Sequence, residues 1–235
     1  MTSIKQLNLQ QGYALLAKKS HQTGTHRHYG IELILCEQAG FDLFTENGSY
    51  LRLNAAIIPS NLPHRFQCGD ATCQLLFLDP LSPLGQYVFN RYQLYLRQDI
   101  VANPPDIENL FSDFQSLNSL SSAADMNGLR KIDFRIQNCL QQIRANPDCA
   151  KLSVRQLTEV SFLSESRLSH LFKQQLGVSI RQFILWNRIG LAVSKSNDGH
   201  SLTTAALYAG FSDSSHFCRA FSDMFGSSPF HTLKS

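Results

Sequence analysis

The sequence predicts an α+β protein: a small antiparallel β-barrel, then helices, then an all-α domain with two helix-turn-helix units joined by a linker helix. Two observations carry this prediction. The first eighty residues hold short β-rich runs separated by turn signals, with no helical period. In the last third, the pattern Leu168-x3-Phe172-x4-Gly177-x-Ser179 recurs 49 positions later as Phe217-x3-Phe221-x4-Gly226-x-Ser228. We therefore divide the chain into a barrel (1–80), a helical connector (81–128) and a helical domain (129–235).

Strand candidates in the barrel are runs rich in branched and aromatic residues, bounded by turn residues. Asn47-Gly48 is a strong hairpin signal, and Asn61-Leu62-Pro63 is a second break. Short strands at such spacing favour a small antiparallel barrel. The five runs are residues 31–36, 41–45, 49–53, 55–59 and 73–78.

The connector is polar and has a helical period. Amphipathic stretches lie at 84–96, 107–117 and 129–146, with a break at Asn103-Pro104-Pro105. The third stretch ends before Pro147 and opens the helical domain. The first two stretches could cover the barrel or form a dimer contact, and the sequence leaves both alternatives open.

Each helix-turn-helix unit, at 153–175 and 201–225, has a short apolar helix, a tight turn and a second helix with apolar residues at i, i+3 and i+4. That spacing buries one stripe and turns the other face outward. Ser164 and Asp213 can cap the second helices. The linker helix, 179–194, has about 16 residues and spans roughly 24 Å. It could hold the two second helices about 34 Å apart, which suits successive major-groove segments.

A family resemblance extends from about Lys131 to Ser235. The spaced matches are Ser164-x3-Leu168-Ser169-x2-Phe172-Lys173-x3-Gly177, Arg188-Ile189-x2-Ala192, and Ala206-x3-Gly210-Phe211-x-Asp213-x3-Phe217-x-Arg219-x-Phe221-x4-Gly226-x-Ser228-Pro229. They resemble the DNA-binding domain of the AraC/XylS family of bacterial transcription regulators. The departures are Thr158 for a small residue, Ser222-Asp223 for a basic pair and Thr232-Leu233 for an aromatic-arginine end. The resemblance implies sequence-specific binding to double-stranded DNA, a homodimer made by the helices after the barrel, and a contact with RNA polymerase.

Candidate DNA-binding residues follow from subtracting the buried stripe of each second helix. The resemblance favours the outward residues of the first helix as groove-facing, with Arg167 nearer to phosphate. In the second helix, Arg219 is the best candidate for a bidentate contact with guanine. The alternative for any single position is a solvated surface residue. The set is Ser166, Arg167, Ser169, His170 and Lys173, then Ser214, Ser215, His216 and Arg219.

A second constellation lies in the barrel. His26, His28 and Glu32 are all even-numbered, so alternation along one strand would place them on one face. With His64, they resemble the two motifs of cupin barrels, although Asn61 stands where glycine is usual. That resemblance implies a divalent transition metal (Zn, Mn, Fe, Ni or Cu) bound by three imidazoles and a carboxylate. Pocket lining for a small organic effector and a purely structural role are the alternatives.

Composition indicates an ordinary globular protein of two domains. Hydrophobic residues make up 43% and charged residues 17%. The net charge of +3 arises entirely after residue 145, which suits nucleic acid but implies few phosphate contacts. We find no signal peptide and no apolar run of membrane-spanning length, so we expect a cytoplasmic protein without membrane contact. The six cysteines lack zinc-ribbon spacing, and we expect them to be reduced and buried; a redox pair of Cys68 and Cys73 is the alternative.

The function expected is an AraC-type transcription regulator controlled by a ligand or metal in its cupin-like domain. We assign no catalytic residues, because the barrel lacks a Ser/His/Asp or Cys/His nucleophile set. One alternative is a metal-dependent cupin enzyme fused to a DNA-binding module. Another is a barrel that serves only for dimerisation, in which case no ligand would alter DNA affinity.

Overall fold

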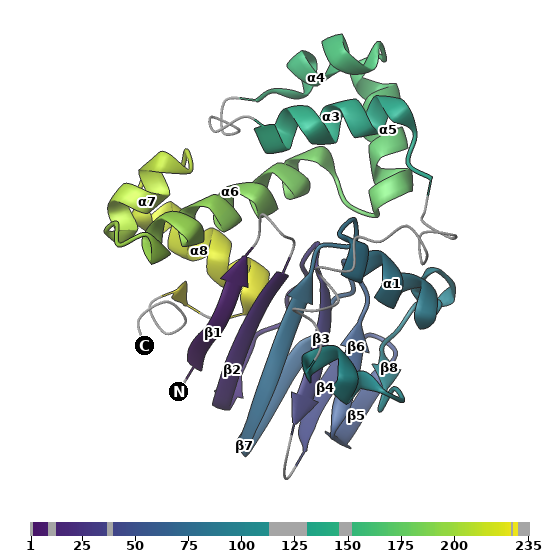
Figure 1. Cartoon of the computed structure of the whole chain (residues 1–235), viewed down its shortest axis with the longest axis vertical. Coiled ribbons are helices and arrows are strands. Elements are labelled where there is room, and N and C mark those ends of the chain that lie inside the picture. The colour runs from purple at the N-terminus through teal and green to yellow at the C-terminus, as the bar shows by residue number, and fades with distance from the viewer. Residues whose placement is uncertain are drawn as a thin grey trace. The chain divides into compact units, whose positions relative to one another are not determined.

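A computed structural model describes residues 2–8, 13–36, 40–112, 131–145, 152–226 and 228–229 (Figure 1). The chain forms two compact units, residues 1–129 together with 221–235, and residues 130–220. The first unit contains the strands and the second contains most of the helices. The predicted α+β class, with a nearly closed antiparallel barrel followed by helices, is confirmed.

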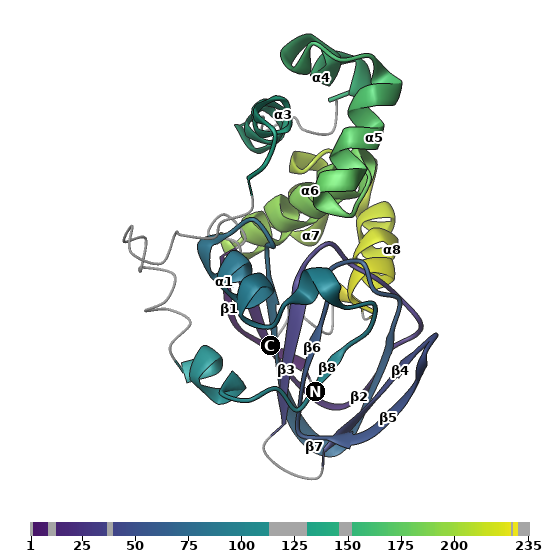
Figure 2. The ribbon, with the colours of Figure 1, turned by 90° about the vertical axis from the view of Figure 1, so that its right-hand side faces the viewer.

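Within the described residues, the barrel has eight strands that curve round on themselves (Figure 2). All pairings between them are antiparallel, and the main path runs β1-β2-β7-β3-β6-β8, with β4 paired to β5 and β7. The strands are β1 (Thr2–Asn8), β2 (Tyr13–Gln22), β3 (Ile31–Cys36), β4 (Phe41–Thr45), β5 (Gly48–Leu53), β6 (Ala55–Ile58), β7 (Arg65–Leu78) and β8 (Val101–Ala102).

Strand β7 is long and bent, and it pairs with different strands along its length. Its first part, up to Cys68, pairs with β4, whereas its last part, from Cys73, pairs with β3. Strand β2 follows the other edge of both parts. Three residues of β7 (69–71) oppose the single residue Ser20 of β2, which is a bulge that lets the strand bend.

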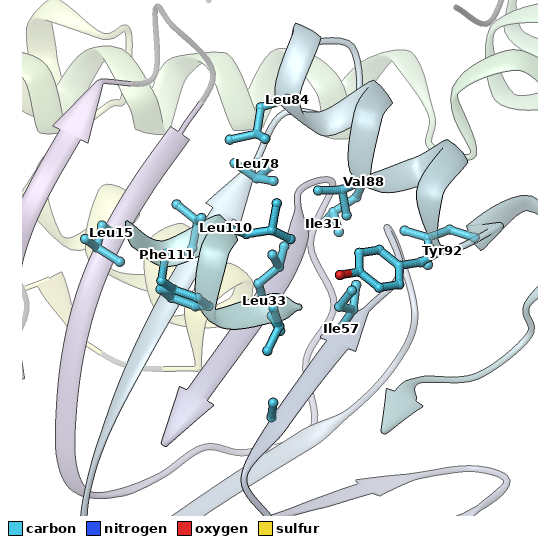
Figure 3. Packing of buried hydrophobic residues seen from close by; sticks show 14 residues of the cluster. Leu15, Ile31, Leu33, Ile57, Leu78, Leu84, Val88, Tyr92, Leu110 and Phe111 are labelled. Atoms are coloured by element: carbon cyan, nitrogen blue, oxygen red, sulfur yellow. The ribbon is translucent and has the colours of Figure 1, made fainter. Parts of the chain in front are cut away.

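Strand β3 is buried on both faces, which explains its continuous apolar sequence. Ile31 and Leu33 face the covering helices and belong to the main hydrophobic cluster (Figure 3). Glu32 and Ile34 alternate with them and so point to the opposite face, the barrel interior. The cluster also contains Leu15, Ile57, Leu76, Leu78, Leu84, Val88, Tyr92, Leu110 and Phe111.

The connector begins with α1 (Pro83–Arg91), whose first turn is capped by the Ser82 hydroxyl. Gln93 adopts a left-handed conformation, so the predicted stretch 84–96 breaks there and ends in a short 3-10 helix, η1 (Leu94–Leu96). Residues 107–112 are helical, as expected. The rest of the predicted 107–117 stretch lies outside the described residues.

Both predicted helix-turn-helix units form. Ser153 and Ser179 each make a capping box with the glutamine three residues on. The linker helix ends three residues later than predicted, and the helix predicted from 129 begins at Phe134. In the part of the chain that is described, no helix is long and apolar enough to cross a membrane. The helices are α3 (Phe134–Ala145), α4 (Val154–Ser161), α5 (Glu165–Leu176), α6 (Ile180–Asn197), α7 (Leu202–Tyr208) and α8 (Ser214–Phe225).

The turn between α4 and α5 contains an unusual residue, Phe162. Its φ is 55°, in the left-handed region, and its side chain is 86% exposed. A non-glycine residue there costs roughly 1–2 kcal/mol, and the exposed ring offers no compensating burial. We expect Phe162→Gly to stabilise the second unit by about 1 kcal/mol, measured as the free energy of urea unfolding. Phe162→Ala keeps the strain and serves as the control; equal stability of the two variants would contradict the argument.

Candidate functional site

The four predicted barrel residues come together in space. Only Glu32 lies on β3; His26 and His28 lie in the irregular segment that precedes it, and His64 lies just before β7. The expectation that alternation along one strand aligns His26 and His28 with Glu32 is therefore wrong. Instead, the backbones of His26 and His64 form an isolated antiparallel bridge with two N–H···O bonds of 3.0 Å. This bridge is the physical cause of the convergence.

The cluster is compact and buried. One ligand atom from each of the four residues lies within 4.8 Å of the others. The exposed fractions are 9% for His26, 3% for His28, 2% for Glu32 and 1% for His64. Phe77 of β7 closes one side, with its ring edge-on to His28 at 5.1 Å between centroids. Four polar groups therefore share a space from which water is largely excluded.

Each imidazole is held by its Nδ1 atom against a backbone carbonyl two residues away. The Nδ1···O distances are 3.0 Å from His26 to Gly24, 2.8 Å from His28 to Gly30 and 2.8 Å from His64 to Leu62. A carbonyl can only accept, so the proton belongs on Nδ1 in every ring. The lone pair of each Nε2 is then free. Sequence reasoning missed these carbonyls; the glycines two residues from His26 and His28 were the available signal.

Two Nε2 atoms face the same carboxylate oxygen, Glu32 Oε2. His28 Nε2 lies 3.1 Å away, and His64 Nε2 lies 3.2 Å away but makes no hydrogen bond of normal geometry. A neutral ring with its proton on Nδ1 has nothing to donate to this oxygen. The 3.1 Å contact between His28 Nε2 and Glu32 Oε2 is therefore favourable only when a proton or a metal ion lies between the two atoms. Additional protons or a metal ion would satisfy the arrangement.

Burial and charge shift the ionisation of the cluster. Burial lowers the pKa of His26 to about 3, and repulsion from His64 and His28 adds to this effect. Burial raises the pKa of Glu32, but hydrogen bonds and positive charge from His28 and His64 in their protonated forms outweigh burial and hold that pKa well below its usual range. The cluster thus offers a neutral imidazole at His26 and a carboxylate at Glu32. Metals require these protonation states of their ligands.

The donor set fits a divalent transition metal. Zinc binds imidazole nitrogen and carboxylate oxygen at about 2.0–2.2 Å in a tetrahedral arrangement, so its ligand atoms lie roughly 3.5 Å apart. The ligand atoms here span up to 4.8 Å, so the widest pair would have to close by about an ångström to bind the ion. Hydrogen bonds from the remote Nδ1 atoms are the outer-shell support that metal-binding histidines use. In the described part of the chain, this is the one cluster of His, Cys, Asp and Glu with such geometry.

The predicted DNA-binding residues lie at or near the surface of their helices. On α5, Leu168, Phe172 and Leu176 are buried, and all five predicted residues are exposed. On α8, Ser215 and Arg219 are exposed, whereas Ser214 and His216 are half-buried. The Ser164 hydroxyl caps α5, and Asp213 Oδ1 accepts a 2.7 Å hydrogen bond from the His216 amide at the start of α8. The predicted caps are therefore confirmed.

Two polar side chains near α8 have structural contacts. His216 Nδ1 lies 3.2 Å from the Ser212 hydroxyl, and its ring packs edge-on against Phe211. Arg188 of α6 donates to the carbonyls of Ala209 and Gly210, and its guanidinium lies 4.3 Å from the Phe211 ring centroid. Arg188 thus holds the turn between α7 and α8. The contacts of His216 with Ser212 and Phe211 leave only part of its imidazole ring available for contacts with other molecules.

The described cysteines are free thiols, as expected, and four of the five are buried. Cys149 lies outside the described residues. Cys36 and Cys73 are partners across β3 and β7. Hydrogen bonding with Cys68, then burial, raises the pKa of the Cys73 thiol. A thiol held protonated reacts slowly with oxidants, which counts against the redox pair Cys68–Cys73.

Comparison with known proteins identifies the C-terminal region. Residues 157–235 match a family of helix-turn-helix domains. The chain is 38% identical over 80 residues to the probable transcriptional regulator LumQ of Photobacterium leiognathi, covering 34% of this chain and 32% of that protein. It is 32% identical over 99 residues to the arabinose operon regulatory protein of Salmonella typhimurium, covering 42% and 35%. The chain thus carries an AraC-type helix-turn-helix domain, and it spans about a third of the length of these relatives.

The whole fold also has a counterpart. A crystal structure of unsaturated fatty acid bound wild-type ToxT from Vibrio cholerae matches with a TM-score of 0.55 and 14% sequence identity, covering 96% of this chain and 95% of that one. At this identity the likeness shows the fold alone. The arrangement of an N-terminal barrel followed by helices and a helix-turn-helix domain is therefore shared with ToxT.

Proposed function

We propose that this chain is a DNA-binding transcription regulator of the AraC type that acts in the cytoplasm and has no enzymatic activity. Its C-terminal helix-turn-helix domain and the regulatory role of the proteins that share it support this proposal. The exposed polar faces of α5 and α8 are available to read bases. A homodimer and a contact with RNA polymerase stay predictions.

We further propose that the barrel senses a divalent transition metal, held by His26, His28, Glu32 and His64. The observation that carries this proposal is the convergence of imidazole nitrogen atoms and one carboxylate in a buried cluster. A bound ion would supply the positive charge that this arrangement lacks. His26 and the other histidines bind it through Nε2, and the Nδ1 hydrogen bonds hold the rings in place.

Elemental analysis tests the metal site. Protein purified without a histidine tag should carry close to one equivalent of one transition metal per chain, or take it up on dialysis and then melt at a higher temperature. Less than about a tenth of an equivalent of metal, without a rise in Tm on adding metal, would rule out the metal site. An organic effector would then be the expected ligand of the barrel. ToxT supports that alternative, because its structure holds a fatty acid. Turnover by metal-loaded protein would favour the enzyme alternative.

The salt dependence of DNA binding provides a further prediction. Five cationic side chains on the described DNA-binding helices are exposed: Arg155, Arg167, Lys173, Arg181 and Arg219. Lys195 is half-buried and pairs with Asp198, and Arg188 is engaged at the α7–α8 turn. We expect roughly four to six phosphate contacts per chain, hence a slope of log affinity against log salt of about −3.6 to −5.4. A slope that implies ten or more contacts would refute this count.

A further inference from the structure

The end of helix α8 lies against Thr23 and the metal-site residue His26. Gly226 follows α8 in a left-handed conformation, φ +64°, and its amide donates to the Ser222 carbonyl. A Cβ atom on Gly226 would lie 2.5 Å from Thr23 Cβ and 3.1 Å from His26 Cε1. Residues 221–235 belong to the same compact unit as the barrel. The absence of a side chain at Gly226 therefore lets the backbone approach Thr23 and His26 closely.

A second contact reaches the site through aromatic rings. Phe225, at the last position of α8, is buried, and its ring lies edge-on to Phe77 at 5.2 Å. Phe77 in turn lies edge-on to His28 at 5.1 Å. Phe221, one turn earlier on α8, packs on Phe225 at 4.6 Å between centroids. Two of the four site residues are thus connected to the end of α8 by packing. His26 lies next to Gly226, and His28 is linked to Phe225 through the Phe77 ring.

His26 is the least constrained member of the cluster. Its Nδ1 atom bonds to Gly24, and its ring packs on His64 at 4.3 Å between centroids. Unlike His28 and His64, it has no described contact within salt-bridge distance of the Glu32 carboxylate. A metal ion that binds His26 Nε2 would fix this ring, and with it the surface on which Gly226 rests.

We propose that occupancy of the metal site controls how firmly the end of α8 is held on the barrel, through His26–Gly226 and His28–Phe77–Phe225. Helix α8 is continuous from Ser214, so the residues held at its end and the predicted DNA-binding residues Ser215 and Arg219 lie on one helix. Metal binding thereby regulates the second helix-turn-helix unit. This inference rests on the proposed metal site, and it assigns a coupling role to Phe225 and Gly226.

Zinc titration combined with amide hydrogen exchange tests the coupling. In the wild type, saturating zinc should slow exchange in peptides that cover residues 221–226 by about fivefold or more. Gly226→Ala should weaken zinc binding by about fivefold or more and abolish the zinc-dependent protection, because coupling acts equally in both directions. Phe225→Leu keeps an apolar side chain but loses the ring contact, and it should reduce the protection if Gly226→Ala proves too unstable to study.

Gly177→Ala is the matched control. Gly177 ends α5 with φ +74°, also in the left-handed region, but its missing Cβ has no neighbour within 4 Å. This variant carries the same type of backbone strain and should bind zinc like the wild type. If zinc binds with one-to-one stoichiometry but exchange at 221–226 is unchanged, the coupling is wrong and the metal site stands. If zinc does not bind, both proposals fail.

Discussion

Glu32→Gln is expected to remove the stabilisation that metal gives to the barrel. At a free metal concentration about 100 times Kd, binding stabilises the folded wild type by about 2.7 kcal/mol. Glutamine has nearly the same size as glutamate but no charge, so the three imidazoles would lose their anionic partner. Thermal unfolding with and without metal measures the effect, and the variant should show little or no metal-dependent rise in Tm.

His200→Ala is the control for this experiment. His200 is exposed and lies outside the cluster, so its loss should leave the metal-dependent rise in Tm unchanged. His64→Ala should behave like Glu32→Gln, because its Nε2 faces the same carboxylate. A metal-dependent rise that survives in both cluster variants would place the metal elsewhere.

The double variant His170→Ala/Lys173→Ala is expected to reduce specific DNA binding to the level of non-specific binding. Both side chains are exposed on α5, whose opposite face is buried. The first helix-turn-helix unit carries most of the exposed cations, so we expect it to contribute most of the binding energy. On α8, Arg219→Ala should cost about 1–3 kcal/mol and relax discrimination at one base pair.

Fluorescence titration at one fixed salt concentration measures these effects. Arg91→Ala is the matched control, because it removes a part-exposed helical cation from α1, where we predict no DNA contact. Circular dichroism should show that the variants remain folded. Equal losses from the α5 and α8 variants would contradict the predicted division of labour.

The fold could be predicted where local patterns agree with tertiary packing. The i, i+3, i+4 pattern of α5 and the caps Ser164 and Asp213 depend on neighbours in sequence, and the structure reproduces them. Strands β1 and β2 were not predicted. Strand β2 ends in polar residues from Lys18 to Gln22 and forms by pairing with the distant β7, which no local pattern reveals.

The site also combines a part that the sequence predicts with a part that depends on distant contacts. The residue types His26, His28, Glu32 and His64 marked the cluster in the sequence, and the structure brings them together. The reason given for their alignment was wrong, because a long-range bridge between His26 and His64 replaces regular strand alternation. Gly226 fits the repeat as a helix-ending glycine. Its contact with His26 joins positions 200 residues apart and could not be inferred from spacing.

A metal bound in the barrel should change the affinity of this protein for DNA. The most direct test is to capture genomic DNA fragments with one preparation of purified protein, either loaded with zinc or treated with a chelator, and to measure its affinity for the enriched fragments in both states. We expect the affinity for a two-part site to differ by about fivefold or more between the states. Equal affinity in both states, with zinc shown to be bound, would contradict the account.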